Sequence, residues 1–171
     1  MKTTDLTHTA LMTAVLCILA PISIPVGSVA FSLATFVIYL MAYILKPRQA
    51  LAAVGIYLLL GAAGLPVFAG FLSGISRFAA PGGGYLIGYL FLAGIGGGFM
   101  QKYSQITFQI FGLFLGTLAM YLLGTGWLSL STGISFFSAL PMGILVFLPL
   151  DTLKILLASY LGQKIKLHIK N

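Results

Sequence analysis

The chain has 171 residues, of which 60% are hydrophobic and only 6% are charged, and its formal net charge is +7. An ordinary soluble domain carries about 25% charged residues, so these few charges cannot cover the surface of a soluble fold of this length. Because each membrane crossing needs roughly 20 apolar residues, the length predicts an all-α integral membrane protein, a single domain over residues 1–171 with about six spans.

We expect six transmembrane helices, at about residues 8–26, 29–45, 49–68, 85–101, 106–124 and 146–167. Polar or helix-breaking residues separate them, most clearly Pro25 with Gly27, KPRQ (46–49) and QKYSQ (101–105). The basic residues near the helix ends fall on one side of this arrangement, and Arg77 alone lies in a loop on the other side. Because basic loops face the cytoplasm, both termini are expected there. Basic residues spread thinly between apolar runs argue against a nucleic-acid partner.

The first predicted helix contains ALMTA, in which Ala10 and Ala14 lie four residues apart. Small residues at this spacing let two helices approach closely. Such a groove is suited to a helix of a partner protein or to packing within the bundle. The spacing alone favours packing within the bundle.

Two segments do not have the composition of simple spans. Residues 69–84 are rich in glycine and are expected to form an outer loop; residues 125–145 are polar in the middle and are expected to form an outer loop that folds back over the bundle. The first segment contains Arg77 and leads into Gly83, Gly84 and Tyr85. Glycines let backbone N–H groups approach a ligand, and tyrosine offers an amphipathic ring. This segment is a candidate pocket wall, and contact of Arg77 with lipid headgroups is the alternative.

Nucleotide and metal motifs are not found in the sequence. The stretch AGIGGGF (93–99) does not fit a dinucleotide motif, and the chain has no phosphate-binding loop ending in G-K-[ST]. One cysteine and two histidines near opposite ends give no sequence-local ligand cluster. We therefore expect no ATP hydrolysis by this chain, no cofactor, no metal and no enzymatic activity.

The last apolar run contains PLDTLK (149–154), which places Asp151 and Lys154 one helical turn apart within a predicted span. Counting back from Lys164 at about 1.5 Å per residue puts Asp151 in the outer third of the hydrocarbon region and Lys154 near its middle. Side chains lean toward the helix N-terminus, so Lys154 is expected to reach back toward Asp151. The pair is either a capping group with its counter-ion or, because charges at this depth are costly, a functional site. With Arg77, it would line a pocket for a small carboxylate ligand.

Three motifs, GLPVFAG (64–70), PGGGYLIGY (81–89) and PLDTLK, resemble those of the BioY family, and the similarity runs from ALMTA through FSLATF (31–36) to the last helix. BioY proteins are the biotin-binding subunits of energy-coupling factor transporters. The resemblance implies a six-helix subunit of a bacterial or archaeal plasma membrane that captures biotin from outside. It also implies docking onto a transmembrane coupling subunit that carries two ATPases. The chain departs from the family at Gly82, where Thr is common, and at Leu150, where Gly is common.

The resemblance implies roles for particular residues. Contacts with the ligand are implied for Asp151, Lys154, Gly83, Gly84 and Tyr85. Docking onto the coupling subunit is implied for Ala10 and Ala14. Arg77 is a candidate ligand contact from its position and not from a motif.

Three alternatives stay open at this point. A sister subunit for another vitamin, such as thiamin or riboflavin, would share the fold and the partners. An intramembrane enzyme using Asp151 and Lys154 as an acid–base pair lacks a second acid or a nucleophile in the predicted spans. A secondary transporter working alone usually shows inverted repeats, which we do not find.

Overall fold

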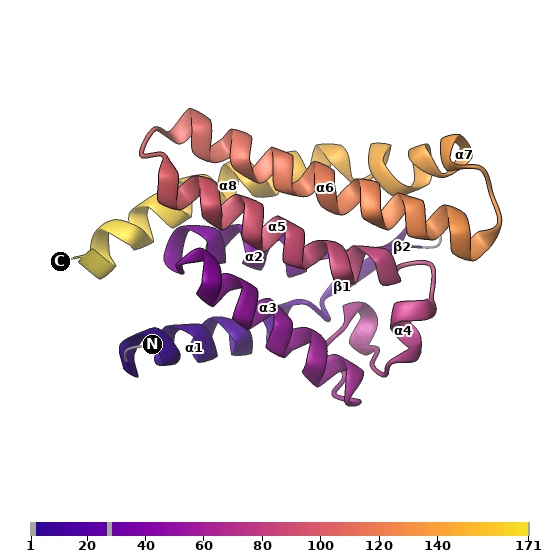
Figure 1. Ribbon diagram of the computed structural model, residues 1–171, viewed down its shortest axis with the longest axis horizontal. Helices are drawn as coiled ribbons and strands as arrows, with labels where there is room; N and C mark the ends of the chain where they lie inside the picture. The colour runs from indigo at the N-terminus through magenta and orange to yellow at the C-terminus, as the bar shows by residue number, and fades with distance from the viewer. Residues whose placement is uncertain (1–2, 27–28, 171) are drawn as a thin grey trace.

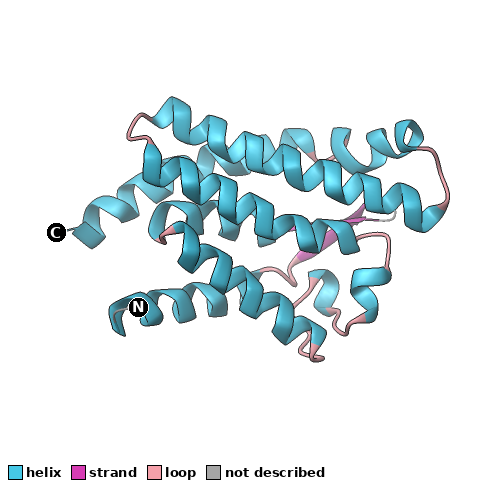
Figure 2. Cartoon of the chain, in the orientation of Figure 1, coloured by secondary structure: helices cyan, strands magenta, loops and turns pink. Residues whose placement is uncertain are grey.

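The computed structural model describes residues 3–26 and 29–170 and shows a bundle of helices that carries one short β-hairpin (Figure 1; Figure 2). In chain order the elements are α1 (Thr3–Leu19), β1 (Ser23–Val26), β2 (Val29–Ser32), α2 (Ala34–Ile44), α3 (Pro47–Ala62), η1 (Ala69–Phe71), α4 (Ser76–Ala79), α5 (Gly83–Lys102), α6 (Ile106–Thr132), α7 (Phe136–Leu140), η2 (Pro141–Leu145) and α8 (Leu148–Lys170). Both termini lie at one end of the bundle, and α4 and α7 lie at the other end (Figure 1).

Within residues 3–26 and 29–170, three helical segments are long and apolar enough to cross a membrane: Gly83–Lys102, Ile106–Thr132 and Phe136–Ile165, the last combining α7, η2 and most of α8. Three further apolar helices, α1, α2 and α3, are shorter. The prediction of a mostly helical membrane protein is therefore confirmed. The helix bounds differ from the predicted spans in three places.

The β-hairpin is the first difference, because the predicted first and second helices included its strands. The strands β1 and β2 are antiparallel, with Ser23 opposite Ser32. Pro21 and Pro25 explain why the helix does not continue, since proline lacks the N–H that an α-helix needs. The Ser32 hydroxyl donates to Ala20 O at 2.7 Å and accepts from the backbone N–H of Ala34 at 2.9 Å. It therefore ties the end of α1 to the start of α2. Gly27, expected in the turn, lies outside the described residues.

The second difference lies between α3 and α5. The predicted third span reached residue 68, whereas α3 ends at Ala62. Phe68 turns back toward the helix, and its ring lies directly on Gly61, where any Cβ would collide with it. Phe68 also meets Tyr57 and Phe78 edge to face, with ring centroids 5.6 and 5.8 Å apart. These aromatic contacts fold residues 63–80 over the end of the bundle.

The third difference lies in the segment 125–145, which we expected to be a loop. Helix α6 continues to Thr132 and ends at Gly133, whose φ of 73° is a left-handed conformation that glycine adopts without strain. The chain then turns into α7 and η2, both packed against α6. Within residues 125–145, only residues 133–135 are without helical structure. The prediction of a loop is therefore wrong for most of this segment. The expected return of the chain over the bundle is observed.

Helices α5 and α6 form the tightest helix pair, and small residues make their close approach possible. A Cβ on Gly88 would lie 2.9 Å from Met120 Cα, and one on Gly116 would lie 3.2 Å from Leu92 Cα. Gly84 and Gly112 are equally confined, against Trp127 and Phe99 respectively. Small residues spaced four apart let two helices approach closely, and the pairs Gly84 with Gly88 and Gly112 with Gly116 show this kind of packing. Several of the polar residues described next lie on this closely packed pair of helices.

Candidate ligand-binding site

Asp151 and Lys154 form a buried ion pair in the first turns of α8. Their residues are only 4% and 7% exposed, and Lys154 Nζ lies 3.0 Å from Asp151 Oδ1. Pro149 lies in the same first turn, where its missing N–H costs no intrahelical bond. The predicted contact between the two side chains is therefore confirmed.

The Asp151 carboxylate is held by hydroxyl groups from two other helices. Thr35, at the start of α2, donates to Oδ1 at 3.0 Å. Tyr121, in the middle of α6, donates to Oδ2 at 2.6 Å. With Lys154 this makes three donors to one carboxylate, and these hydrogen bonds offset the cost of burying it. The three helices α2, α6 and α8 thus meet at one carboxylate.

The Lys154 ammonium also has three partners, all within the protein. It donates to the backbone O of Ser32 at 2.6 Å and to Thr35 Oγ1 at 2.8 Å, in addition to Asp151. Nζ lies 3.7 Å from the centroid of the Phe31 ring, a cation–π contact. A lysine has three N–H donors, so Lys154 has none left. It fixes strand β2 to α8.

A small cavity, which we call the charged pocket, lies against this pair. Its volume is about 30 Å³, room for a water molecule or two by the usual measure. The hairpin, α2, α5, α6, α8 and the residue before α8 all contribute to its lining: Val29, Ala30, Phe31, Ser32, Thr35, Tyr85, Tyr89, Met120, Tyr121, Phe147, Asp151 and Lys154.

A second and larger cavity, the arginine pocket, lies next to the charged pocket. Its volume is about 180 Å³, and its lining includes Arg77, Leu72 and Gly82. The two pockets share four lining residues: Val29, Ala30, Tyr85 and Tyr89. Arg77 is half-buried in α4, and its guanidinium has no hydrogen bond or ion pair within residues 3–26 and 29–170. The structure therefore places Arg77 in the adjoining pocket and not beside the Asp151 carboxylate.

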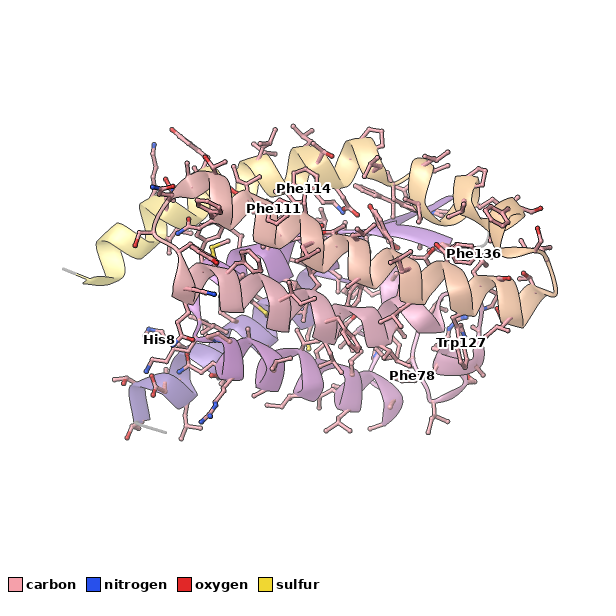
Figure 3. All side chains as sticks on the ribbon, turned by 45° about the horizontal axis from the view of Figure 1, so that its top comes forward. His8, Phe78, Phe111, Phe114, Trp127 and Phe136 are labelled. Atoms are coloured by element: carbon pink, nitrogen blue, oxygen red, sulfur yellow. The ribbon has the colours of Figure 1, made fainter. Side chains whose placement is uncertain are left out.

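Tyr85 lines both pockets and also fixes the segment after α7. Its hydroxyl donates to the backbone O of Gly143 at 2.9 Å and lies 3.2 Å from Thr125 Oγ1. Gly83 and Gly84 contribute to neither pocket. A Cβ on Gly83 would strike the Phe78 carbonyl, and one on Gly84 would strike Trp127, so both glycines are explained by packing. Figure 3 shows Phe78 and Trp127 at this end of the bundle, where Trp127 Nε1 donates to Ala80 O at 3.1 Å.

Ala10 and Ala14 lie on the exposed face of α1. The buried face of the same helix carries Thr9, Met12, Thr13 and Leu16. The spacing alone favoured packing inside the bundle for the two alanines. The structure shows instead that this face of α1 is open within the described chain.

Four site residues were missed by the sequence interpretation: Phe31, Ser32, Thr35 and Tyr121. Thr35 is separated from Asp151 by 116 residues and Tyr121 by 30, so no local spacing connects them. Phe31, Ser32 and Thr35 lie in the stretch FSLATF (31–36). The resemblance of this stretch to the family named in the sequence analysis was the only signal that could have found them. A polar residue in an apolar helix, such as Tyr121, is too common to single out.

These features define a multi-pass protein of the cell membrane with a buried ion pair beside two adjoining pockets. The sequence profile described as "BioY family" matches residues 1–171. "Biotin transporter BioY2" of Lactococcus lactis subsp. cremoris is 37% identical over 94% of this chain and 89% of that protein. "Biotin transporter BioY" of Thermotoga maritima is 33% identical over 95% of each. The chain therefore belongs to the BioY family.

A solved structure is similar over nearly the whole fold. The "S-component for biotin from an ECF-type ABC transporter", determined by crystallography, aligns with a TM-score of 0.90 at 30% identity. The alignment covers 96% of this chain and 92% of that one. The two chains therefore share their overall fold.

Proposed function

We propose that this chain is the biotin-binding S subunit of an energy-coupling factor transporter and serves biotin uptake. The observation that carries the proposal is the Asp151 carboxylate, which is buried, accepts from three donors and lies at the wall of the charged pocket, next to the arginine pocket. Family membership supports biotin as the ligand in preference to thiamin or riboflavin. Biotin offers chemistry that matches: a ureido ring with two N–H donors, an apolar thioether ring and a carboxylate at the end of a valerate chain.

The pattern of occupied hydrogen-bond groups suggests which end of biotin each charge meets. Lys154 has no donor left for a carboxylate, whereas the Arg77 guanidinium has all of its donors available within the described chain. Asp151 can still accept, because a carboxylate has about four lone-pair sites and three are used. We therefore place the ureido ring at Asp151 and the valerate carboxylate at Arg77, with the rings of Tyr85 and Tyr89 between them.

The charged pocket must widen for this ligand. A cavity of roughly 150 Å³ can hold a ring the size of benzene, whereas the charged pocket has a volume of about 30 Å³. Biotin has two fused rings, so entry requires displacement of a wall. The hairpin is the candidate, because β2 is joined to α8 mainly through Lys154 and the Phe31 ring.

The arrangement in the membrane supports the remaining parts of the proposal. We propose six spans in one domain, with both termini in the cytoplasm and both pockets open to the outside. Helix α2 has only 11 residues, fewer than the roughly 17 needed to span alone, and the hairpin supplies the rest of the depth. Its strands hydrogen-bond to each other, which non-helical backbone at this depth requires. The exposed face of α1 with Ala10 and Ala14 would then dock onto the coupling subunit with its two ATPases.

A binding panel tests the ligand. The purified protein in detergent is titrated with biotin, and thiamin and riboflavin are tested as competitors. We expect saturable biotin binding that neither competitor displaces. Asp151→Asn should weaken binding at least tenfold, because a hydrogen bond to a charged group contributes about 1.5–3 kcal/mol. Displacement of biotin by either vitamin, or wild-type affinity in Asp151→Asn, would contradict the proposal.

The uncharged biotin amide tests the placement of Arg77. Arg77→Ala should weaken binding of biotin about tenfold to a hundredfold, which corresponds to one charge-assisted hydrogen bond. The same variant should bind biotin amide as the wild type does, since the amide has no carboxylate for the guanidinium to meet. Equal losses for both ligands would show that Arg77 does not meet the carboxylate.

A further inference from the structure

A third cavity opens on the side of the bundle between α6 and α8, and we call it the lateral groove. Its volume is about 420 Å³, larger than either pocket of the ligand site. The lining is almost entirely apolar: Phe111, Phe114, Leu115, Leu118, Ile144, Leu148 and Ile155 with Thr117, Tyr121, Asp151 and Thr152. Figure 3 shows Phe111 and Phe114 on the side of α6 that faces α8.

The polar groups of the lateral groove are already hydrogen-bonded. Thr117 Oγ1 is bonded to Leu113 O at 2.8 Å and to Tyr39 Oη at 2.8 Å. Tyr121 donates to Asp151, and Thr152 Oγ1 donates to Leu148 O at 2.7 Å. A buried water needs about two to four polar partners, and these groups have little capacity left. The groove is therefore unsuited to water.

The mouth of the lateral groove is continuous with the surface that the protein presents to the membrane. Phe111, Leu118 and Leu148 at its rim are 57%, 48% and 42% exposed, and they belong to two helical segments apolar enough to cross a membrane. What stands outside this rim is lipid hydrocarbon. The Tyr121–Asp151 hydrogen bond closes the floor of the groove. A cavity of roughly 150 Å³ already binds benzene, so a flexible hydrocarbon chain fits this space.

We propose that the lateral groove binds one acyl chain of a membrane phospholipid. The chain replaces the dispersion contacts that an empty apolar cavity of this size lacks. Tyr121 and Asp151 line both the lateral groove and the charged pocket. The bound chain therefore forms the membrane side of the wall that holds the Asp151 carboxylate, and it keeps water away from the ion pair.

Tryptophan fluorescence with brominated phospholipid tests the groove. The native Trp127 is replaced by Phe, and a single reporter is introduced as Leu118→Trp at the rim. The matched control is Phe91→Trp on α5, a residue outside the groove with 49% exposure against 48% for Leu118. Phosphatidylcholine with brominated acyl chains is titrated into the detergent-purified protein. We expect the groove reporter to be quenched to saturation at an equimolar amount of lipid and the control to be quenched only in proportion to total lipid.

Two further arms keep the result decisive. Leu148→Phe, which fills the groove, should abolish the saturable quenching at Leu118→Trp, and Leu115→Trp serves as a second reporter if Leu118→Trp does not fold. Equal, unsaturable quenching at groove and control positions would overturn the proposal. The proposal would also be overturned if a second copy of the chain covered the groove, which would shield the reporter from lipid and would be detected as a cross-linked dimer. The readout does not involve biotin, so its failure is separate from a failure of the proposed function.

Discussion

Lys154 illustrates how a buried charge is held at the level of single residues. Each of its three N–H donors has a partner in the protein, and its ammonium also lies on the Phe31 ring. Asp151 depends on Lys154 in turn, because a carboxylate that loses its cation in a low-dielectric site is strongly destabilised. The two side chains therefore act as one unit.

Removing only one member of the pair should cost more stability than removing both. Lys154→Met is expected to lower the free energy of unfolding by about 3–5 kcal/mol, because it leaves the Asp151 carboxylate buried without its cation. The double variant Asp151→Asn with Lys154→Met should regain most of that loss. Thermal unfolding in detergent measures both. Neither variant should bind biotin with wild-type affinity.

Lys46→Met is the matched control for this experiment. The Lys46 side chain is 70% exposed and pairs with Asp5 at 3.4 Å, and exposed pairs contribute about 0–1 kcal/mol. Its effect on the unfolding temperature should be small. A double variant no more stable than Lys154→Met would show that the ion pair does not act as a unit.

At the residue scale the sequence predicted the ion pair and could not predict its environment. The contact between Asp151 and Lys154 follows from helix geometry and side-chain direction, which are local. The contacts with Thr35, Ser32 and Tyr121 depend on how distant helices pack. Gly83 and Gly84 belong to the motif PGGGYLIGY, which implied contact with the ligand. The atoms around each Cα show instead that neighbouring residues leave no space for a side chain there.

At the scale of elements, α5 and α6 are held together by glycines whose neighbours leave no space for a methyl group. The position of Gly88 is the most informative, because its hypothetical Cβ meets both the backbone and the side chain of Met120. Gly98, ten residues further along the same helix, has nothing within 4 Å of its hypothetical Cβ. Alanine substitutions at these two positions therefore distinguish the effect of close helix packing on stability from the effect of helix propensity.

Gly88→Ala is therefore expected to destabilise the protein by about 1–3 kcal/mol, the usual cost of overpacking. Gly98→Ala should be neutral or stabilising by up to about 1 kcal/mol, since alanine favours a helix over glycine. Thermal unfolding of the two variants in the same detergent measures the difference. Equal unfolding temperatures would mean that α5 and α6 can move apart without loss of stability.

The elements also show where sequence patterns stop being sufficient. The bounds of α5 agree with the predicted span within two residues, because QKYSQ clearly marks the end of its apolar run. The hairpin was missed, although Pro21 and Pro25 mark it, because the pairing of β1 with β2 and the Lys154 bond to Ser32 O are formed between segments. Length and hydrophobicity alone cannot distinguish such a hairpin from the end of a span.

At the scale of the whole molecule, the ligand pockets and the exposed alanine face are formed by different elements. The pockets are lined by the hairpin, α2, α4, α5, α6 and α8, whereas Ala10 and Ala14 lie on the open face of α1. Figure 1 shows α1 beside α3, on the side of the bundle away from α6. Binding of the ligand and docking of a partner should therefore be separable by mutation.

The double variant Ala10→Leu with Ala14→Leu tests this separation. Larger side chains at small positions prevent close approach of a partner helix, so co-purification with the coupling subunit and biotin uptake should both be lost. The affinity of the purified variant for biotin should equal that of the wild type, because neither alanine touches a pocket. Ala119→Leu, a half-exposed alanine on α6, is the control and should retain uptake. Lost biotin affinity in the double variant would mean that the α1 face supports the fold, and retained uptake would mean that docking uses another surface.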